Sequence, residues 1–150
     1  MKALFVKLLF LLLLLQSCIS TKSTIKNIDN EAPVPILKSK NQFELTKYST
    51  NQKYGFDPDY PINVYFQNTK NDTLNCVRFL NALAGPKQEK IQFKRTESCC
   101  PFPSKQSKIG AGFLEVYEVF IQNEKPKKLY FNIYEKGILE IPKGFTIKEN

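Results

Sequence analysis

The sequence predicts an α+β domain in which one amphipathic helix packs on a small, mostly antiparallel sheet. Three observations lead to this fold class. One stretch, residues 72–84, repeats its apolar side chains with the period of a helix. Several later stretches alternate apolar and polar side chains with the period of a strand. Turn residues separate these stretches, and no internal repeat is present.

Residues 1–17, ahead of that domain, have the features of a secretory signal peptide. Lys2 and Lys7 supply positive charge, and Leu8–Leu15 is an unbroken apolar run. A run of this length is shorter than the roughly 20 residues that span a bilayer, but it suits the apolar core of a signal peptide. We therefore expect an exported protein.

The leader ends in Leu15-Gln16-Ser17-Cys18, which resembles the lipobox of bacterial lipoproteins. The resemblance implies cleavage before Cys18 and up to three acyl chains, palmitate among them, on that residue. Two or more chains hold a protein at a membrane almost permanently, because each buried methylene contributes about 0.8 kcal/mol. Ile19 and Ser20 carry no acidic retention signal, which favours the outer membrane over the inner one. Ordinary secretion without a lipid is the alternative.

Residues 18–53 are predicted to form the lipidated cysteine and a flexible tether. From Ile19 to Lys53 the composition shifts to Lys, Ser, Thr, Asn and Gln, without a sustained apolar period. Such a composition predicts disorder. As a flexible coil of about 35 residues, its ends would lie on the order of 30 Å apart.

Residues 54–150 are predicted to form the folded domain. The expected elements are a turn at 55–59, a strand at 62–67, the helix at 72–84, strands at 90–96, 113–122, 129–134, 138–141 and 145–147, and a long loop at 97–112. The stretch 113–122 is apolar on both faces, which predicts a central position in the sheet.

The predicted helix begins near Asp72 and is ended by Gly85-Pro86. Its apolar stripe comprises Cys76, Val77, Leu80, Leu83 and Ala84. Asn75, Arg78 and Asn81 fall on the opposite side, so Cys76 is expected to face the core.

The composition excludes several kinds of chemistry. The chain contains no histidine, so it lacks the commonest general base and the commonest metal ligand. No phosphate-binding glycine loop or nucleophile elbow is present, and no catalytic residue, metal or cofactor is predicted. Without Lys2 and Lys7 the chain keeps 20 basic and 14 acidic residues, a charge of +6. That charge suits anionic lipid or glycan surfaces or simple solubility, and nucleic acid is not expected outside the cytoplasm.

Three cysteines remain after Cys18 is lipidated, and an oxidising envelope favours pairing among them. The leading prediction is a structural disulfide that joins Cys76 to either Cys99 or Cys100 and leaves one spare thiol. The alternatives are a redox-active or partner-bonding thiol, a thiolate metal site without a convincing fourth ligand, and a Cys99–Cys100 bridge. A bridge that closes about 24 residues would stabilise the fold by roughly 3–4 kcal/mol.

Two further groups are candidates for a site. Tyr117, Tyr130 and Tyr134 are predicted to form an aromatic face for a glycan or an envelope protein, unless they pack beneath a loop. Glu115 and Glu118 point to opposite faces of one strand, so they cannot converge as glycoside hydrolysis requires. Solvated or salt-bridged carboxylates are expected instead.

Several motifs resemble a family of short bacterial envelope lipoproteins of unknown function. They are Arg78-Phe79-Leu80-Asn81-Ala82-Leu83 with Gly85-Pro86, Ser98-Cys99-Cys100-Pro101-Phe102, Gly112-Phe113-Leu114 with Tyr117-Glu118-Val119, Leu129-Tyr130-Phe131-Asn132-Ile133-Tyr134, and Pro142-Lys143-Gly144-Phe145-Thr146. The likeness covers residues 54–147, and the Ser-Cys-Cys-Pro-Phe element is its most specific part. Members are sometimes labelled 2-dehydro-3-deoxyphosphooctonate aldolase. That enzyme resembles a (β/α)₈ barrel, which takes about 250 residues, and this chain has 150.

The sequence therefore predicts a lipid-anchored envelope protein with a binding or structural role. The rival hypothesis is a thiol-active protein that uses the Cys99-Cys100 loop. An accessible cysteine with a lowered pKa would favour the rival.

Overall fold

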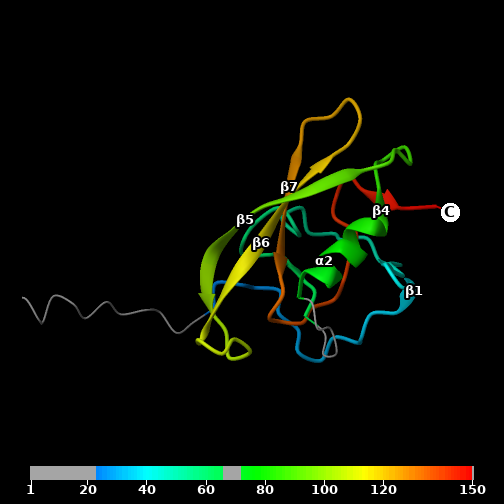
Figure 1. Ribbon diagram of the computed structural model, residues 1–150. Helices are drawn as coiled ribbons and strands as arrows, with labels where there is room; N and C mark the ends of the chain where they lie inside the picture. Colours follow the sequence, from blue (N-terminus) through cyan, green and yellow to red (C-terminus); the bar gives the residue numbers. More distant parts are fainter. Residues whose placement is uncertain (1–22, 66–71, 150) are drawn as a thin grey trace, which may run out of the picture.

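The computed structural model describes residues 23–65 and 72–149 (Figure 1). Its centre is a four-stranded sheet in the order β3-β7-β6-β5, and two-stranded ladders β1–β2 and β4–β8 accompany it. The elements are β1 (Leu37–Ser39), β2 (Gln42–Phe43), β3 (Ile62–Asn63), α2 (Asp72–Asn81), β4 (Leu83–Ala84), β5 (Gln92–Pro103), β6 (Ala111–Phe120), β7 (Lys127–Asn132) and β8 (Thr146–Ile147). All strand pairs are antiparallel except β3–β7, so the predicted α+β class with a mostly antiparallel sheet is confirmed.

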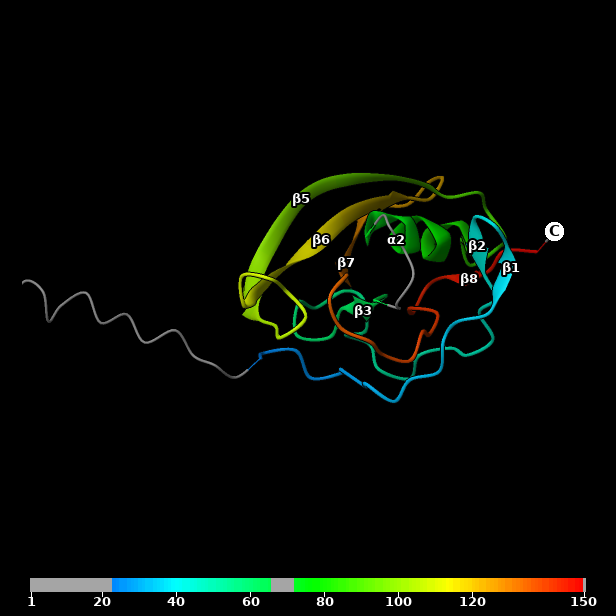
Figure 2. The ribbon, with the colours of Figure 1, turned by 60° about the horizontal axis from the view of Figure 1, so that its bottom comes forward.

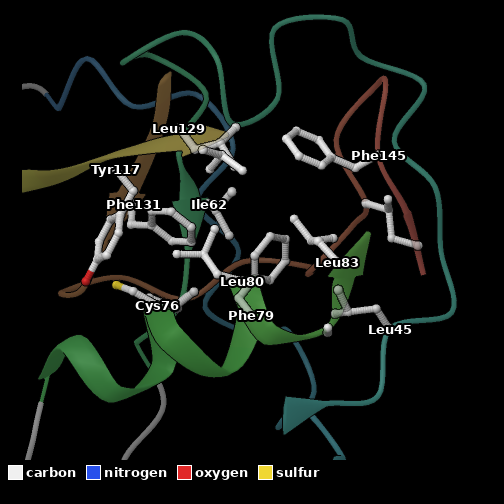
Figure 3. Packing of buried hydrophobic residues seen from close by; sticks show 14 of the residues in the cluster. Leu45, Ile62, Cys76, Phe79, Leu80, Leu83, Tyr117, Leu129, Phe131 and Phe145 are labelled. Atoms are coloured by element: carbon white, nitrogen blue, oxygen red, sulfur yellow. The ribbon is translucent and has the colours of Figure 1, made fainter. Parts of the chain in front are cut away.

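Helix α2 packs in the hollow of the sheet, and β5 and β6 curve over it (Figure 2). Cys76, Phe79 and Leu80 are fully buried on the side of the helix that faces the sheet (Figure 3). The Phe79 ring meets the Phe131 ring edge-on, with 5.7 Å between centroids. The predicted inward direction of Cys76 is confirmed.

The helix ends at Asn81 and not at Ala84 as predicted. Leu83 and Ala84 leave the helix to form β4, which pairs with Ile147 and Thr146 of β8. A ladder between residues about 60 apart in the sequence overrides the local helical pattern, because burial in this ladder satisfies the same apolar side chains.

The side of α2 opposite the apolar stripe makes polar contacts with other parts of the chain. The Asn75 side chain is buried and donates to the Val64 carbonyl oxygen at 2.8 Å. Arg78 Nε donates to the Lys40 carbonyl oxygen, and Asn81 Nδ2 donates to that of Asn41, at the turn between β1 and β2. Arg78 and Asn81 thus bind this turn to the helix.

The amino-terminal segment is the largest departure from the predicted organisation. Ile25 is 7% exposed, and Phe43 and Leu45 are buried in the main core around α2. Backbone bonds tie the segment to the domain, among them Ser49 N to the Ile141 oxygen at 2.9 Å. The prediction of a flexible tether is therefore wrong for residues 23–53. Residues 1–22, which include the predicted leader and Cys18, lie outside the described residues.

Strands β5 and β6 form a hairpin that is longer than predicted. The expected loop at 97–112 is strand as far as Pro103, and only residues 104–110 connect the two strands. Two irregularities interrupt the pairing, between Arg95 and Glu97 and between Cys99 and Phe102. The bulges break the alternation of side chains, so the period of a strand is hidden in the sequence. Strand β6 lies between β5 and β7, as its two apolar faces predicted.

The carboxyl-terminal region agrees with the prediction in part. The inward positions Leu129, Phe131 and Ile133 are buried, as predicted from their alternation. The expected strand at 138–141 is not one: Ile141 makes an isolated bridge to Tyr48. This stretch pairs with the amino-terminal segment, which the sequence did not predict to be folded.

Two apolar clusters lie on opposite faces of the sheet. The main cluster packs around α2 and includes Ile62, Phe79, Leu80, Tyr117, Leu129 and Phe131. The second cluster has Ile25, Phe102 and Leu114 at its centre, with Ile28, Cys99, Cys100, Tyr130 and Tyr134 packed against them. Among the described residues no helix is long and apolar enough to cross a membrane.

Candidate functional site

Cys99 and Cys100 are bonded to each other and not to the helix. They lie in the second irregularity of β5, where Cys100 has a φ of 57°, in the left-handed region. Both side chains are half-buried against the second cluster. The vicinal bridge, the least favoured of the sequence-based alternatives, is the one that forms.

Cys76 is a free, fully buried cysteine, so the predicted bridge to the Cys99-Cys100 element is wrong. The reason is the direction in which successive side chains of β5 point. Ser98 lies opposite Glu115 in the register, and Cys99 lies opposite Leu114 of the second cluster. Because neighbouring strand residues point to opposite faces, Cys99 points away from the main cluster that contains Cys76.

Burial also makes Cys76 a poor nucleophile. Loss of solvation raises the pKa of its thiol well above the ordinary value of 9.0, and the nearby Glu115 carboxylate raises that pKa further. Since the thiolate is the reactive form, Cys76 is inert in the folded chain. Among the cysteines that the structure describes, thiol chemistry is therefore left to the Cys99–Cys100 pair.

The three tyrosines do not form one exposed face. Tyr117 is buried in the main cluster, where its ring meets Phe131 with 5.3 Å between centroids. Tyr130 and Tyr134 pack against the second cluster, on the other side of the sheet. Tyr117 is therefore not available to a partner, and Tyr134 lines a small polar cavity.

Glu115 and Glu118 do not converge, because they point to opposite faces of β6, as predicted. Glu115 is buried and accepts hydrogen bonds from Arg95 Nε and, at 3.0 Å, from Ser98 Oγ. Glu118 lies in register with Lys94 and Lys128 on the other face. Glu115 is thus a paired structural carboxylate.

A polar cavity of about 150 Å³ lies where the carboxyl ends of β5 and β7 meet the amino-terminal segment. It is lined by Asn30, Tyr65, Gln106, Tyr134, Glu135 and Lys136. Glu135 is only 8% exposed, and its Oε1 accepts a hydrogen bond from Ser104 Oγ at 2.6 Å. Within the described residues its second oxygen has no hydrogen-bond or ion-pair partner. A carboxylate held at one oxygen and open at the other is suited to bind a donor or a cation.

A chain of buried amides fixes the position of Glu135. Asn132 Oδ1 accepts the backbone N–H groups of Tyr134 at 2.9 Å and of Glu135 at 3.3 Å. Asn132 Nδ2 donates to Asn63 Oδ1, and Asn63 Nδ2 donates to the Asn27 carbonyl oxygen at 2.8 Å. A side chain at Gly137 would lie 2.8 Å from Asn63 Nδ2, so this glycine is required. The network preorganises the cavity.

Sequence reasoning missed this cavity because its residues come from four separated segments. A weak signal was present: Asn63 and Asn132 stand within predicted strands, where asparagine is disfavoured. Each alternates with apolar neighbours in its strand, and both are buried. No group of three or more metal-ligating side chains occurs among residues 23–65 and 72–149.

A larger hollow of about 410 Å³ lies at the other end of the domain, beside β4 and the start of β5. Its floor is apolar and includes Leu83, Ile91 and Phe93. None of the charged side chains that line it is buried. The smaller cavity is the better candidate site, because only there does a buried charge face open space.

Comparison of the chain with protein-family models, curated proteins and solved structures found no match.

Proposed function

We propose that the chain is a lipid-anchored module of the bacterial cell envelope whose domain binds a ligand or partner and does not act as an enzyme. The observation that carries this proposal is the apolar leader Leu8–Leu15 followed directly by Cys18. The likeness to short envelope lipoproteins leads to the same proposal. We further propose that the membrane is the outer one, because no acidic residue follows Cys18 directly.

The arrangement of the domain supports attachment close to a membrane. Only seven residue steps separate Cys18 from the buried Ile25, a reach of at most about 25 Å for an extended chain. The hairpin loop 104–110 lies at the same end of the molecule as the first described residues (Figures 1 and 2). In this loop Ile109 is 78% exposed, and Lys105 and Lys108 are exposed near it. An apolar side chain between basic ones suits an anionic lipid surface.

The anchor is tested by mass spectrometry of the amino-terminal peptide and by metabolic labelling with an alkynyl fatty acid. Wild type and Cys76→Ala, which removes a cysteine from the described domain, are expected to take up label and to sediment with membranes. Cys18→Ala is expected to lose both. Density-gradient separation then distinguishes outer from inner membrane. An unmodified mature amino terminus, or an uncut leader, would refute the proposal.

The binding role is supported by the cavity at Glu135, where a buried carboxylate faces open space. The Ser104 hydroxyl donates its hydrogen to this carboxylate and so fixes the orientation of Glu135 toward the cavity. The sequence predicted that Tyr117, Tyr130 and Tyr134 would bind an envelope protein or a glycan. Because Tyr117 is buried, that aromatic face is not available as predicted.

The second candidate function is thiol exchange, and the Cys99–Cys100 bond favours it. Reduction of this bond would take two electrons and two protons from a dithiol protein, which would leave as a disulfide. The test is thiol labelling of membranes before and after mild reductant, with Cys99→Ser/Cys100→Ser as the control. A bond that resists reductant until the protein unfolds would rule this candidate out.

A further inference from the structure

We propose that the cavity at Glu135 binds a small zwitterion that carries a primary ammonium group next to an anionic group, as an ethanolamine phosphate headgroup or a free amino acid does. This inference names the ligand of the binding module proposed above. The inference depends on the proposed function only where it names a lipid headgroup as the source of the ligand.

The ammonium half of the ligand is assigned to Glu135. Its carboxylate is buried, and Ser104 Oγ holds one oxygen while the other faces the cavity. Ser104 Oγ also accepts the N–H of Gln106 at 3.2 Å, so its own hydrogen is committed to Glu135. The carboxylate is therefore oriented before a ligand arrives. A buried charge without a counter-ion is costly, and a bound cation would relieve that cost.

The anionic half of the ligand is assigned to Lys136. This lysine lines the same cavity, and no hydrogen bond or ion pair of its ammonium group occurs within the described residues. Glu135 and Lys136 are consecutive, and yet they do not form a salt bridge with each other. A ligand with both charges would satisfy both side chains, whereas a simple amine would leave the lysine without a partner.

The remaining lining residues fit the same ligand. Tyr65 and Tyr134 provide aromatic walls, which attract cations, and Asn30 and Gln106 provide amides for an anion or a hydroxyl group. The cavity of about 150 Å³ is small and has room for a headgroup or a small amino acid.

The position of the cavity bears on the source of the ligand. Gln106 belongs to the hairpin loop 104–110, the loop that carries Ile109 and lies beside the first described residues. If the anchor holds this end near the bilayer, lipid headgroups lie within reach. Free amino acids and their derivatives share the same chemistry.

The experiment is isothermal titration calorimetry on the full-length protein in detergent. The probes are phosphoethanolamine, alanine, ethanolamine and phosphocholine. We expect phosphoethanolamine or alanine to bind, ethanolamine to bind more weakly because it lacks the anion, and phosphocholine to fail because a quaternary amine has no N–H to donate. Glu135→Gln, which keeps the shape and the bond to Ser104, should weaken binding about tenfold or more.

Two further variants separate the charges. Lys136→Met should weaken phosphoethanolamine binding but leave ethanolamine binding unchanged, and Glu118→Gln, at a residue that does not line the cavity, should change neither. The source of the ligand is then identified with protein in vesicles of phosphatidylethanolamine or of phosphatidylcholine. If only phosphatidylethanolamine competes with the soluble probe for the protein, the lipid headgroup is the ligand.

The inference is overturned if no primary-ammonium zwitterion binds in the millimolar range, if phosphocholine binds as tightly as phosphoethanolamine, or if Glu135→Gln binds like wild type. These results are independent of the lipid on Cys18, which mass spectrometry reports. A protein without the lipid that still binds phosphoethanolamine would refute the anchor alone.

Discussion

Ile25→Ala tests the most consequential feature of the fold, the packing of the amino-terminal segment on the sheet. Ile25 is 7% exposed and contacts the second cluster, whose other buried members are Phe102 and Leu114. Truncation of a buried isoleucine to alanine costs about 2–5 kcal/mol. Since this cluster has only three buried members and can partly collapse, we expect the lower part of that range, about 2–3 kcal/mol.

The matched control is Ile36→Ala, in the same predicted tether. Ile36 is 67% exposed, so its truncation should change stability by less than about 0.5 kcal/mol. The assay is urea unfolding followed by circular dichroism, with the midpoint and the slope compared between variants. If Ile25→Ala and Ile36→Ala are equally mild, the segment does not pack, and the reasoning about the short connection to Cys18 fails with it.

Three other predictions follow from the described residues. In non-reduced, denatured protein whose Cys18 carries the lipid, a single thiol should be labelled, and peptide mapping should place it at Cys76, whereas label on Cys99 or Cys100 would show the other pairing. Because burial raises the Cys76 pKa above its ordinary 9.0, the folded chain keeps a thiol proton that the unfolded chain releases above that pH. The Cys76 thiol should therefore lower the free energy of unfolding from about pH 9 upward, by at most about 1.4 kcal/mol per pH unit, and Cys76→Ala should lack this part of the loss. The chain has no tryptophan, so Ile109→Trp gives a single reporter whose emission should shift to the blue when the lipidated protein sits in anionic vesicles. Phe120→Trp, at the far end of β6, should not shift, and equal responses of the two variants would contradict the membrane contact at the loop.

The sequence predicted strands correctly where the burial of their side chains follows a regular local pattern. The alternation at Leu129, Phe131 and Ile133 and the double apolar faces of β6 follow from local side-chain period, and both are confirmed. The helix was predicted three residues too long, because Leu83 suits either a helix stripe or a strand. Only the partner strand β8 decides between them.

The candidate site could not be predicted, because its parts are brought together by the fold. Glu135 follows β7, Ser104 follows β5, and Tyr65 follows β3, so their meeting depends on strand order and register. The vicinal bridge was underestimated for a related reason. A bulge in β5 sets the direction of Cys99, and a bulge leaves no regular pattern in the sequence.

The sequence by itself determined the fold class, because this depends on local properties, the apolar period and the turn residues. The export signal, which depends on the apolar run before Cys18, stays a prediction. Only the tertiary structure decided that residues 23–53 belong to the domain, that Cys76 stays unpaired, and that Glu135 faces a cavity. Each of these depends on contacts between residues far apart in the chain. Such contacts are set by strand register and by the parity of side chains across a sheet, which no local pattern records.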